Sequence, residues 1–163
     1  MPKKELVTAY HEAGHAVVGH FLGSTPKLLS KIPGKGFVGV ARFRNQFAGI
    51  SLEWDRSGRA HMRVQREIMI CLAGPIAQRK SSPRSWRRYH GGRDHDTAFE
   101  LALRIYPDSC DDFVKWLSQE TTAIIGAKWN YVEGLAKELY TRQTMTGSQI
   151  DETIDALYYQ RSL

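Results

Sequence analysis

Apolar residues recur with the spacing of an α-helix over most of the chain. Residues three and four positions apart lie on one face of a helix, so this pattern predicts helices that bury one side. Gly23 and Pro107 stand where the first and third of these helices would end. We expect helices over residues 4–22, 58–79, 94–106, a segment that opens at Ser109, residues 128–143, and a short last segment after Thr146.

Two of the expected helix starts carry a local signal. Ser109 with Asp112, and Thr146 with Gln149, have the spacing of a capping box, in which two residues exchange hydrogen bonds and open a helix. Met145 stands just before the second box, where an apolar residue would act as a hydrophobic staple. Both positions therefore predict a helix that begins there.

Residues 27–44 interrupt the helical pattern. Gly34 and Gly36 separate two short apolar stretches, and the alternation over residues 37–43 has the period of a strand, which predicts a hairpin or two short strands. The fold class is then α+β and mostly helical, with a small sheet near the N-terminal helix. The chain has 163 residues with no internal repeat and no clear linker, so we expect one domain over residues 1–163.

The composition is that of a globular protein, with 42% hydrophobic and 25% charged residues. No apolar run approaches the ~20 residues that span a bilayer, and the N-terminal segment lacks the apolar stretch of a signal peptide. Cys71 and Cys110 lie far apart in sequence, which is typical neither of a disulfide framework nor of a cysteine zinc site. These features predict a cytoplasmic protein without a membrane span.

The net charge of +6 is unevenly distributed along the chain. Residues 79–93 ("RKSSPRSWRRYHGGR"), here called the basic loop, hold six Arg or Lys residues and no acid. Trp86 and Tyr89 lie between these charges, a combination that can bind nucleic acid. A solvated loop is the favoured interpretation, and a contact with a partner protein or with nucleic acid is the alternative.

Residues 8–23 ("TAYHEAGHAVVGHFLG") contain the motif His-Glu-x-x-His on the first expected helix. His11 and His15 are four residues apart, so both imidazoles face one side and can bind one Zn²⁺. Glu12 is turned by about 100° from His11, beside the metal, where it can accept a proton from a zinc-activated water. The alternative is a core helix with two hydrogen-bonded histidines. His20 points to the opposite face and is interpreted as structural or exposed.

A catalytic zinc site has three protein ligands and one open position, so a third ligand is expected elsewhere in the chain. Asp94 shares one face of its expected helix with Ala98, Leu101, Ala102 and Ile105, and an acid on an apolar face needs a buried partner. Asp96 lies on a mixed face. We therefore predict Asp94 as the third ligand, with Asp96 as the alternative, from the candidates His90, Asp94, His95, Asp96 and Glu100.

Four segments, in this order, resemble the FtsH-type membrane ATP-dependent zinc metallopeptidases. They are residues 8–23, "REIMICLAGPIAQR" (66–79), "GGRDHDTAFELA" (91–102) and "VEGLAKELYTRQTMTGSQIDETI" (132–154). The third segment resembles the one that supplies the family's aspartate ligand. The spacing from Ala98 and Ala102 favours Asp94, whereas counting from the upstream glycine favours Asp96. Gln78 stands where the family usually has a glutamate.

The resemblance implies a zincin-like fold and a zinc endopeptidase with His11, His15 and Asp94 as ligands and Glu12 as base. It also implies that an extended or unfolded polypeptide binds along a sheet edge, for which residues 37–43 are the candidate. The chain has no Walker A motif, so we expect hydrolysis that needs no ATP. A separate partner protein or a homo-oligomer is compatible with this function.

Two other functions fit the sequence. The chain could be a zincin-fold binding or regulatory module that uses the basic loop to hold a partner or nucleic acid. It could also be a zinc hydrolase that acts on a non-peptide amide. Glu12 favours catalysis, because a protein that only binds has no need of a base at this position.

Overall fold

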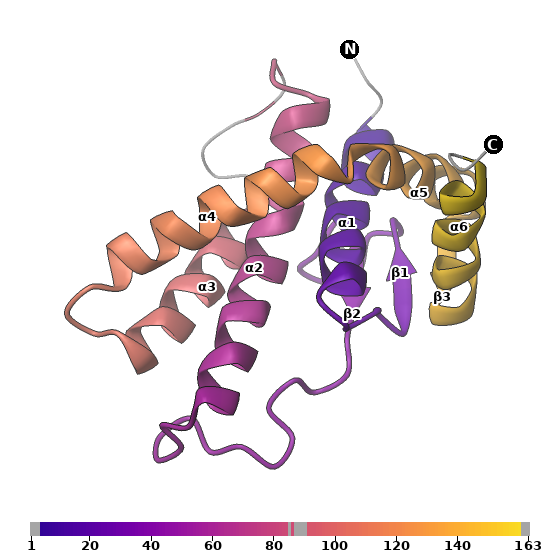
Figure 1. Cartoon of the computed structure of the whole chain (residues 1–163). Coiled ribbons are helices and arrows are strands. Elements are labelled where there is room, and N and C mark those ends of the chain that lie inside the picture. The colour runs from indigo at the N-terminus through magenta and orange to yellow at the C-terminus, as the bar shows by residue number, and fades with distance from the viewer. Residues whose placement is uncertain (1–3, 85, 87–90, 161–163) are drawn as a thin grey trace.

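The computed structural model describes residues 4–84, 86 and 91–160 of the chain. Over these residues it forms six helices and three short strands (Figure 1). In chain order they are α1 (Lys4–Phe21), β1 (Leu28–Ser30), β2 (Val40–Arg42), α2 (Gly58–Ser81), α3 (Gly92–Ile105), α4 (Cys110–Ala127), α5 (Trp129–Arg142), β3 (Thr144–Thr146) and α6 (Gly147–Gln160). The mostly helical α+β fold and the six expected helices are thus confirmed.

The ends of the helices show which of the predicted start and stop signals are present in the structure. Gly23 has a positive φ of 83°, which glycine adopts without strain, and α1 ends just before it. The Thr146–Gln149 capping box is confirmed, because the Thr146 amide donates to Gln149 Oε1 at 2.9 Å and the Gln149 amide donates to Thr146 Oγ1 at 3.4 Å. The capping box predicted at Ser109 is wrong: Ser109 precedes α4, but its side chain accepts no capping hydrogen bond.

The three strands form an antiparallel sheet in the order β2-β1-β3. Leu29 at the centre of β1 pairs with Ala41 of β2 on one side and with Met145 of β3 on the other. The sequence predicts only part of this sheet. Strand β3 (Thr144–Thr146) lies in a segment where the sequence predicts only the start of the last helix. A strand of three residues is too short to show a period, so its pairing depends on contacts with β1.

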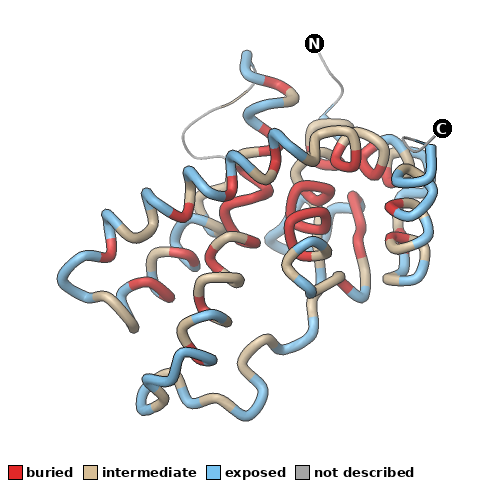
Figure 2. Tube along the Cα trace, viewed as in Figure 1, coloured by how far each residue is buried: buried red, intermediate tan, exposed pale blue. Residues whose placement is uncertain are grey.

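The helices pack in two groups, one of which contains α1 and the other α2 (Figures 1 and 2). One group joins α1 to the sheet, α5 and α6, and the other joins α2 to α3 and α4. The first core includes Val17, Leu29, Val132, Leu135, Leu139, Met145 and Ile150, and the second includes Val64, Ile68, Leu72, Ala98, Leu101 and Leu117. Helix α2 contributes to both cores and therefore holds α3 in place relative to α1.

Helices α1 and α2 lie close together at Gly14. A Cβ atom on Gly14 would come to 2.6 Å from both the carbonyl oxygen of Ala73 and the Cβ of Ala77. A helix backbone cannot move out of the way as a flexible side chain can, so the small residue at position 14 sets the distance between the two helices. This distance matters for function, because both helices also line the candidate site described below.

We expect Gly14→Ala to lower the free energy of unfolding by about 1–3 kcal/mol, because overpacking at the α1–α2 contact outweighs the better helix propensity of alanine. Urea denaturation followed by circular dichroism measures this change. Gly126→Ala is the matched control, since Gly126 lies in α4 and an added Cβ there meets no atom within 4 Å. Equal stability changes in the two variants would contradict the tight packing at Gly14.

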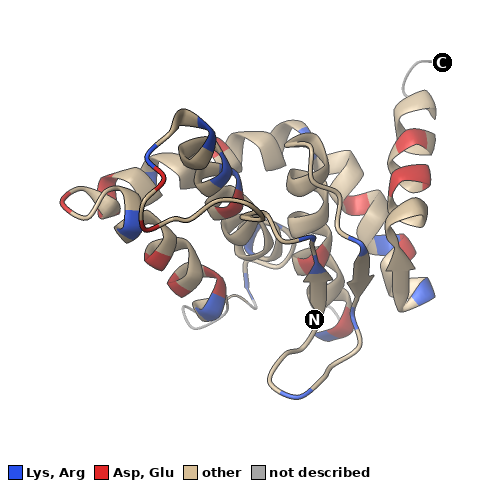
Figure 3. Cartoon of the chain, turned by 90° about the horizontal axis from the view of Figure 1, so that it is seen from below, with Lys and Arg blue, Asp and Glu red and all other residues tan. Residues whose placement is uncertain are grey.

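Among the described residues, no helix combines the length and the apolar character that crossing a bilayer requires. The described Lys and Arg residues lie on several helices and loops (Figure 3).

Candidate metal centre

His11 and His15 lie on the same face of α1, as their spacing predicts. Their Nε2 atoms are 3.1 Å apart, and the ring centroids are 4.8 Å apart at an interplanar angle of 74°. Both rings face α2, where a Cβ on Gly74 would collide with the Nε2 atoms of the two histidines. The glycine in α2 therefore leaves open the space onto which the two nitrogen atoms converge.

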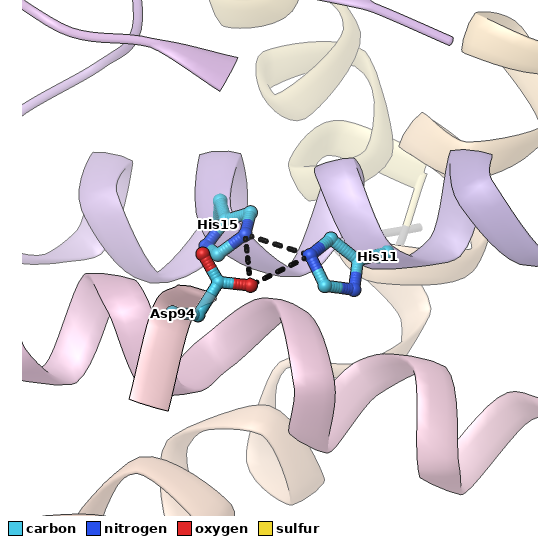
Figure 4. A group of neighbouring side chains, drawn as sticks. All are labelled: His11, His15 and Asp94. Carbon is cyan, nitrogen blue, oxygen red and sulfur yellow. Dashed lines mark hydrogen bonds and ion pairs between the residues drawn. The ribbon is translucent and has the colours of Figure 1, made fainter. Parts of the chain in front are cut away.

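Asp94 reaches these histidines from the first turn of α3 (Figure 4). Its Oδ2 atom is 3.0 Å from Nε2 of His11 and 3.7 Å from Nε2 of His15. The turn before α3 makes this possible: Gly91 has a φ of 77°, and its backbone packs directly on the ring of Pro75 in α2. Helix α3 thus begins against α2 with Asp94 directed at α1.

The other candidates for the third ligand lie elsewhere. His95, Asp96 and Glu100 are exposed on α3, and His90 lies outside the described residues. Within the described part of the chain, the metal-sized group of His, Cys, Asp and Glu side chains consists of His11, His15 and Asp94. The structure therefore separates the two aspartates that the sequence left open and brings Asp94, not Asp96, to the histidines.

Hydrogen bonds on the far side of each ring orient the two histidines. His15 Nδ1 is 2.7 Å from the carbonyl oxygen of Ile70, which can only accept, so Nδ1 carries a hydrogen. His11 Nδ1 is 2.8 Å from Oε1 of Gln78, which gives His11 the same tautomer. In the neutral rings both Nε2 lone pairs then point at each other and at the Asp94 carboxylate.

Three electron-pair donors that converge in this way can bind a cation between them. Four-coordinate zinc with bonds of about 2.0–2.1 Å holds its ligand atoms about 3.3 Å apart. The three separations in the structure, 3.0, 3.1 and 3.7 Å, bracket that value. Two imidazoles and one carboxylate are also a donor set that zinc commonly takes in catalytic sites. The residues present therefore fit the metal that the sequence predicts.

Burial and mutual charge set the ionisation of this group. Burial, together with the charge of His11, lowers the pKa of His15 to about 4, so His15 is neutral at neutral pH. Burial acts to raise the pKa of Asp94, but the hydrogen bond to His11 and the charges of the histidines outweigh it and lower the pKa. Burial likewise opposes protonation of His11, yet Asp94 and Glu12 raise its pKa. A metal ion that binds His11 must displace the proton of its protonated form. The affinity for zinc should therefore decrease as the pH decreases.

Glu12 lies on α1 beside the group and is only 4% exposed. Its carboxylate packs against the segment before β2, where a Cβ on Gly39 would come to 2.6 Å from Oε1. Burial raises the pKa of Glu12 to about 7, with a lowering contribution from His11 and a raising one from Asp94. A carboxyl group with a pKa near neutrality can both accept and return a proton at physiological pH.

A cleft of about 810 Å³ opens on this group. Its walls are α1, α2, the start of α3 and the segment 33–43, so Glu12 and the three metal-group residues face the same space. Strand β2 stands at the edge of the sheet and pairs with β1 on one side. The predicted sheet edge is thus confirmed for residues 40–42, whereas residues 37–39 and 43 lie outside the strand.

Several residues that shape the site were not assigned a role by the sequence. In sequence, Gln78 only departs from the glutamate that is usual in the FtsH-type pattern. In the structure it orients His11. Gly74 was part of the same pattern, and its lack of a side chain leaves room at the two Nε2 atoms. His20 was interpreted correctly as separate from the site, because its Nδ1 is 3.0 Å from Thr25 Oγ1 and from Asp151 Oδ1.

The structure describes only part of the basic loop. Arg79 and Lys80 lie in the last turn of α2, and Arg93 lies in the first turn of α3. Residues 85 and 87–90, which include Tyr89, lie outside the described residues. The interpretation of this loop as a contact for nucleic acid or a partner therefore stays a prediction.

No protein-family model matches this chain, and a search of curated proteins finds no significant match. The case for its function therefore depends on the geometry of the site and on the motifs that the sequence itself contains.

Gln78→Leu should weaken zinc binding by about 10–100-fold, because it removes the acceptor that fixes the tautomer of His11. Competition with a chromogenic chelator measures the dissociation constant. Gln78→Glu keeps an acceptor at the same place and should bind zinc at least as tightly as the unchanged protein. Equal affinities for the leucine and glutamate variants would exclude a role for this hydrogen bond.

Proposed function

We propose that the chain is a zinc-dependent endopeptidase with a zincin-like fold of the FtsH type, acting on extended or unfolded polypeptides. The observation that carries the proposal is the convergence of the His11, His15 and Asp94 donor atoms beside buried Glu12 in a cleft. The resemblance of the four sequence segments supports the same assignment.

His11, His15 and Asp94 would hold the zinc ion. When bound there, zinc lowers the pKa of a water molecule and polarises the peptide carbonyl. Glu12 accepts the proton of the attacking water and then transfers it to the nitrogen of the leaving amine, so that the water adds across the broken C–N bond. Gln78 and Ile70 keep the imidazoles in the tautomer that this arrangement needs.

The free edge of β2 supports binding of an extended chain. Its backbone N–H and C=O groups on the side away from β1 can pair with a substrate strand, which gives affinity with little demand on sequence. Phe37 and Val38, which are 39% and 53% exposed, add apolar contact area beside the cleft. In a folded protein most backbone N–H and C=O groups are already paired, so unfolded segments and flexible peptides are the expected substrates.

A binding module that retains the metal group is the competing proposal. The position of Glu12 favours catalysis, because burying a carboxylate is costly and a structural zinc site gains nothing from one.

The test is incubation of the zinc-loaded protein with an unfolded protein and a peptide library, followed by mass spectrometry of the products. We expect internal cleavage that stops when a chelator removes the metal and returns when zinc is restored. Absence of any product from the zinc-loaded protein, with one zinc bound per chain, would favour the binding module instead.

A further inference from the structure

Glu67 on α2 lines the same cleft as Glu12 and the metal group, but the mechanism above does not use it. Its Oε2 atom is buried and has no hydrogen-bond partner, and no other buried side-chain oxygen or nitrogen in the described part of the chain shares this property. A buried carboxylate oxygen without a donor typically costs more than the roughly 1–3 kcal/mol of a neutral group. The position therefore calls for a donor that comes from outside the chain.

The surroundings of Glu67 give it little compensation. Burial raises its pKa, and the neighbouring Arg66 offsets this only in part. Cys71 lies one turn further along α2, and the charge of Glu67 helps to raise the pKa of that thiol. The described lining of the cleft contains three acids, Glu12, Glu67 and Asp94, against one basic residue, Arg93. A metal ion held by His11, His15 and Asp94 would offset part of this negative charge, so the charge that an entering cation meets away from the metal is that of Glu67.

The distance from the metal group suggests which cation fits. Gly74 is the residue of α2 that faces both Nε2 atoms, and Glu67 precedes it by seven residues. At 1.5 Å per residue the two positions are about 10 Å apart along the helix axis. One residue of an extended chain spans only about 3.3 Å, so the free amino group of a residue at the scissile bond would fall short of Glu67. A long side chain near the scissile bond can reach it.

We propose that Glu67 is a specificity-determining residue that binds a Lys or Arg side chain of the substrate close to the scissile bond. This inference rests on the proposed peptidase function. The ammonium or guanidinium group would donate to the Glu67 carboxylate where this side chain lines the cleft. The net charge of +6 of the whole chain acts against the binding of a cation. The preference thus arises inside the cleft and not from the overall charge.

The experiment uses peptides that are acetylated and amidated at their ends, so that no terminal charge contributes. A cleavable sequence from the library is varied one position at a time between Lys, Arg, Met and Glu. We expect one position near the scissile bond where Lys or Arg raises kcat/KM about tenfold to 100-fold over Met. Glu67→Gln should remove most of this preference, and Glu67→Lys should shift it towards Glu.

Two further variants keep the result interpretable. Glu120→Gln changes an exposed carboxylate on α4 and should leave the preference intact. Glu67→Met replaces the half-buried acid with an apolar side chain of similar shape, should keep the fold, and should also lose the preference. A preference for Lys or Arg that survives in both Glu67→Gln and Glu67→Met would overturn the assignment, as would equal kcat/KM values for Lys and Met peptides at every position.

A binding measurement separates this proposal from the proposed activity. Fluorescence anisotropy of labelled Lys, Met and Glu peptides on the Glu12→Gln protein, with and without Glu67→Gln, needs no hydrolysis. Tighter binding of the Lys peptide that depends on Glu67 would support the cation site even if no peptide were cleaved. Cleavage without any such difference would contradict the cation site and leave the peptidase function standing.

Discussion

Glu12→Gln should retain zinc at the level of the unchanged protein and lose hydrolysis by about 10²–10⁴-fold in kcat. Glutamine has nearly the same shape as glutamate, so it fits the buried position between α1 and Gly39. It cannot accept a proton from the attacking water, and it has none to pass on to the leaving amine. The rate of cleavage of a peptide found in the library and the zinc content per chain measure the two effects.

The control for this variant is Glu152→Gln, which alters an exposed carboxylate of α6 far along the chain and should change neither quantity. Comparison of the thermal unfolding curves of the two variants shows whether the fold is intact. Unchanged cleavage by Glu12→Gln would remove the proposed mechanism, because it would show that Glu12 is not the group that accepts the proton from water.

Asp94→Ala should lose most of the bound zinc. The change removes one of the three proposed ligands, so its effect should exceed the roughly 10–100-fold that follows from the loss of an outer hydrogen-bond partner such as Gln78. The two histidines would remain 3.1 Å apart at Nε2, but without the negative charge that offsets the metal's charge. Zinc analysis after dialysis, together with chelator competition, measures the loss.

Asp96→Ala is the matched control, because Asp96 lies two residues further along α3 and is exposed. The two aspartates have the same chemistry and nearly the same place in the sequence, so only their direction differs. Zinc loss in Asp96→Ala with retention in Asp94→Ala would show that the side chains at the start of α3 are arranged otherwise in the metal-bound protein.

The close approach of α1 and α2 links stability to the site. Gly14 lets α2 approach α1, and the same stretch of α2 then supplies the Ile70 carbonyl and the Gln78 side chain to the two imidazoles. A change in the distance between these helices would move both orienting groups. The Gly14→Ala variant should therefore also bind zinc more weakly, although it touches no ligand.

Much of the fold was predictable because its causes are local. The helices follow from apolar spacing, and the ends of α1 and α6 follow from Gly23 and from the Thr146–Gln149 box. Where local signals were weak the prediction failed. Ser109 had the right spacing but makes no capping bond, and β3 was missed because three residues show no period. Pairing with a strand more than a hundred residues away leaves no mark on so short a segment.

Part of the candidate site likewise follows from local sequence, and part follows from the packing of the helices. The sequence by itself determined that His11 and His15 share a face with Glu12 beside them, because residues on one helix have fixed relative positions. Only the tertiary structure decided that Asp94 and not Asp96 approaches them, that Gln78 and Ile70 orient the rings, and that Glu67 faces the cleft without a partner. These features depend on how α2 and α3 pack against α1, and distances between elements follow from the packing of the whole chain.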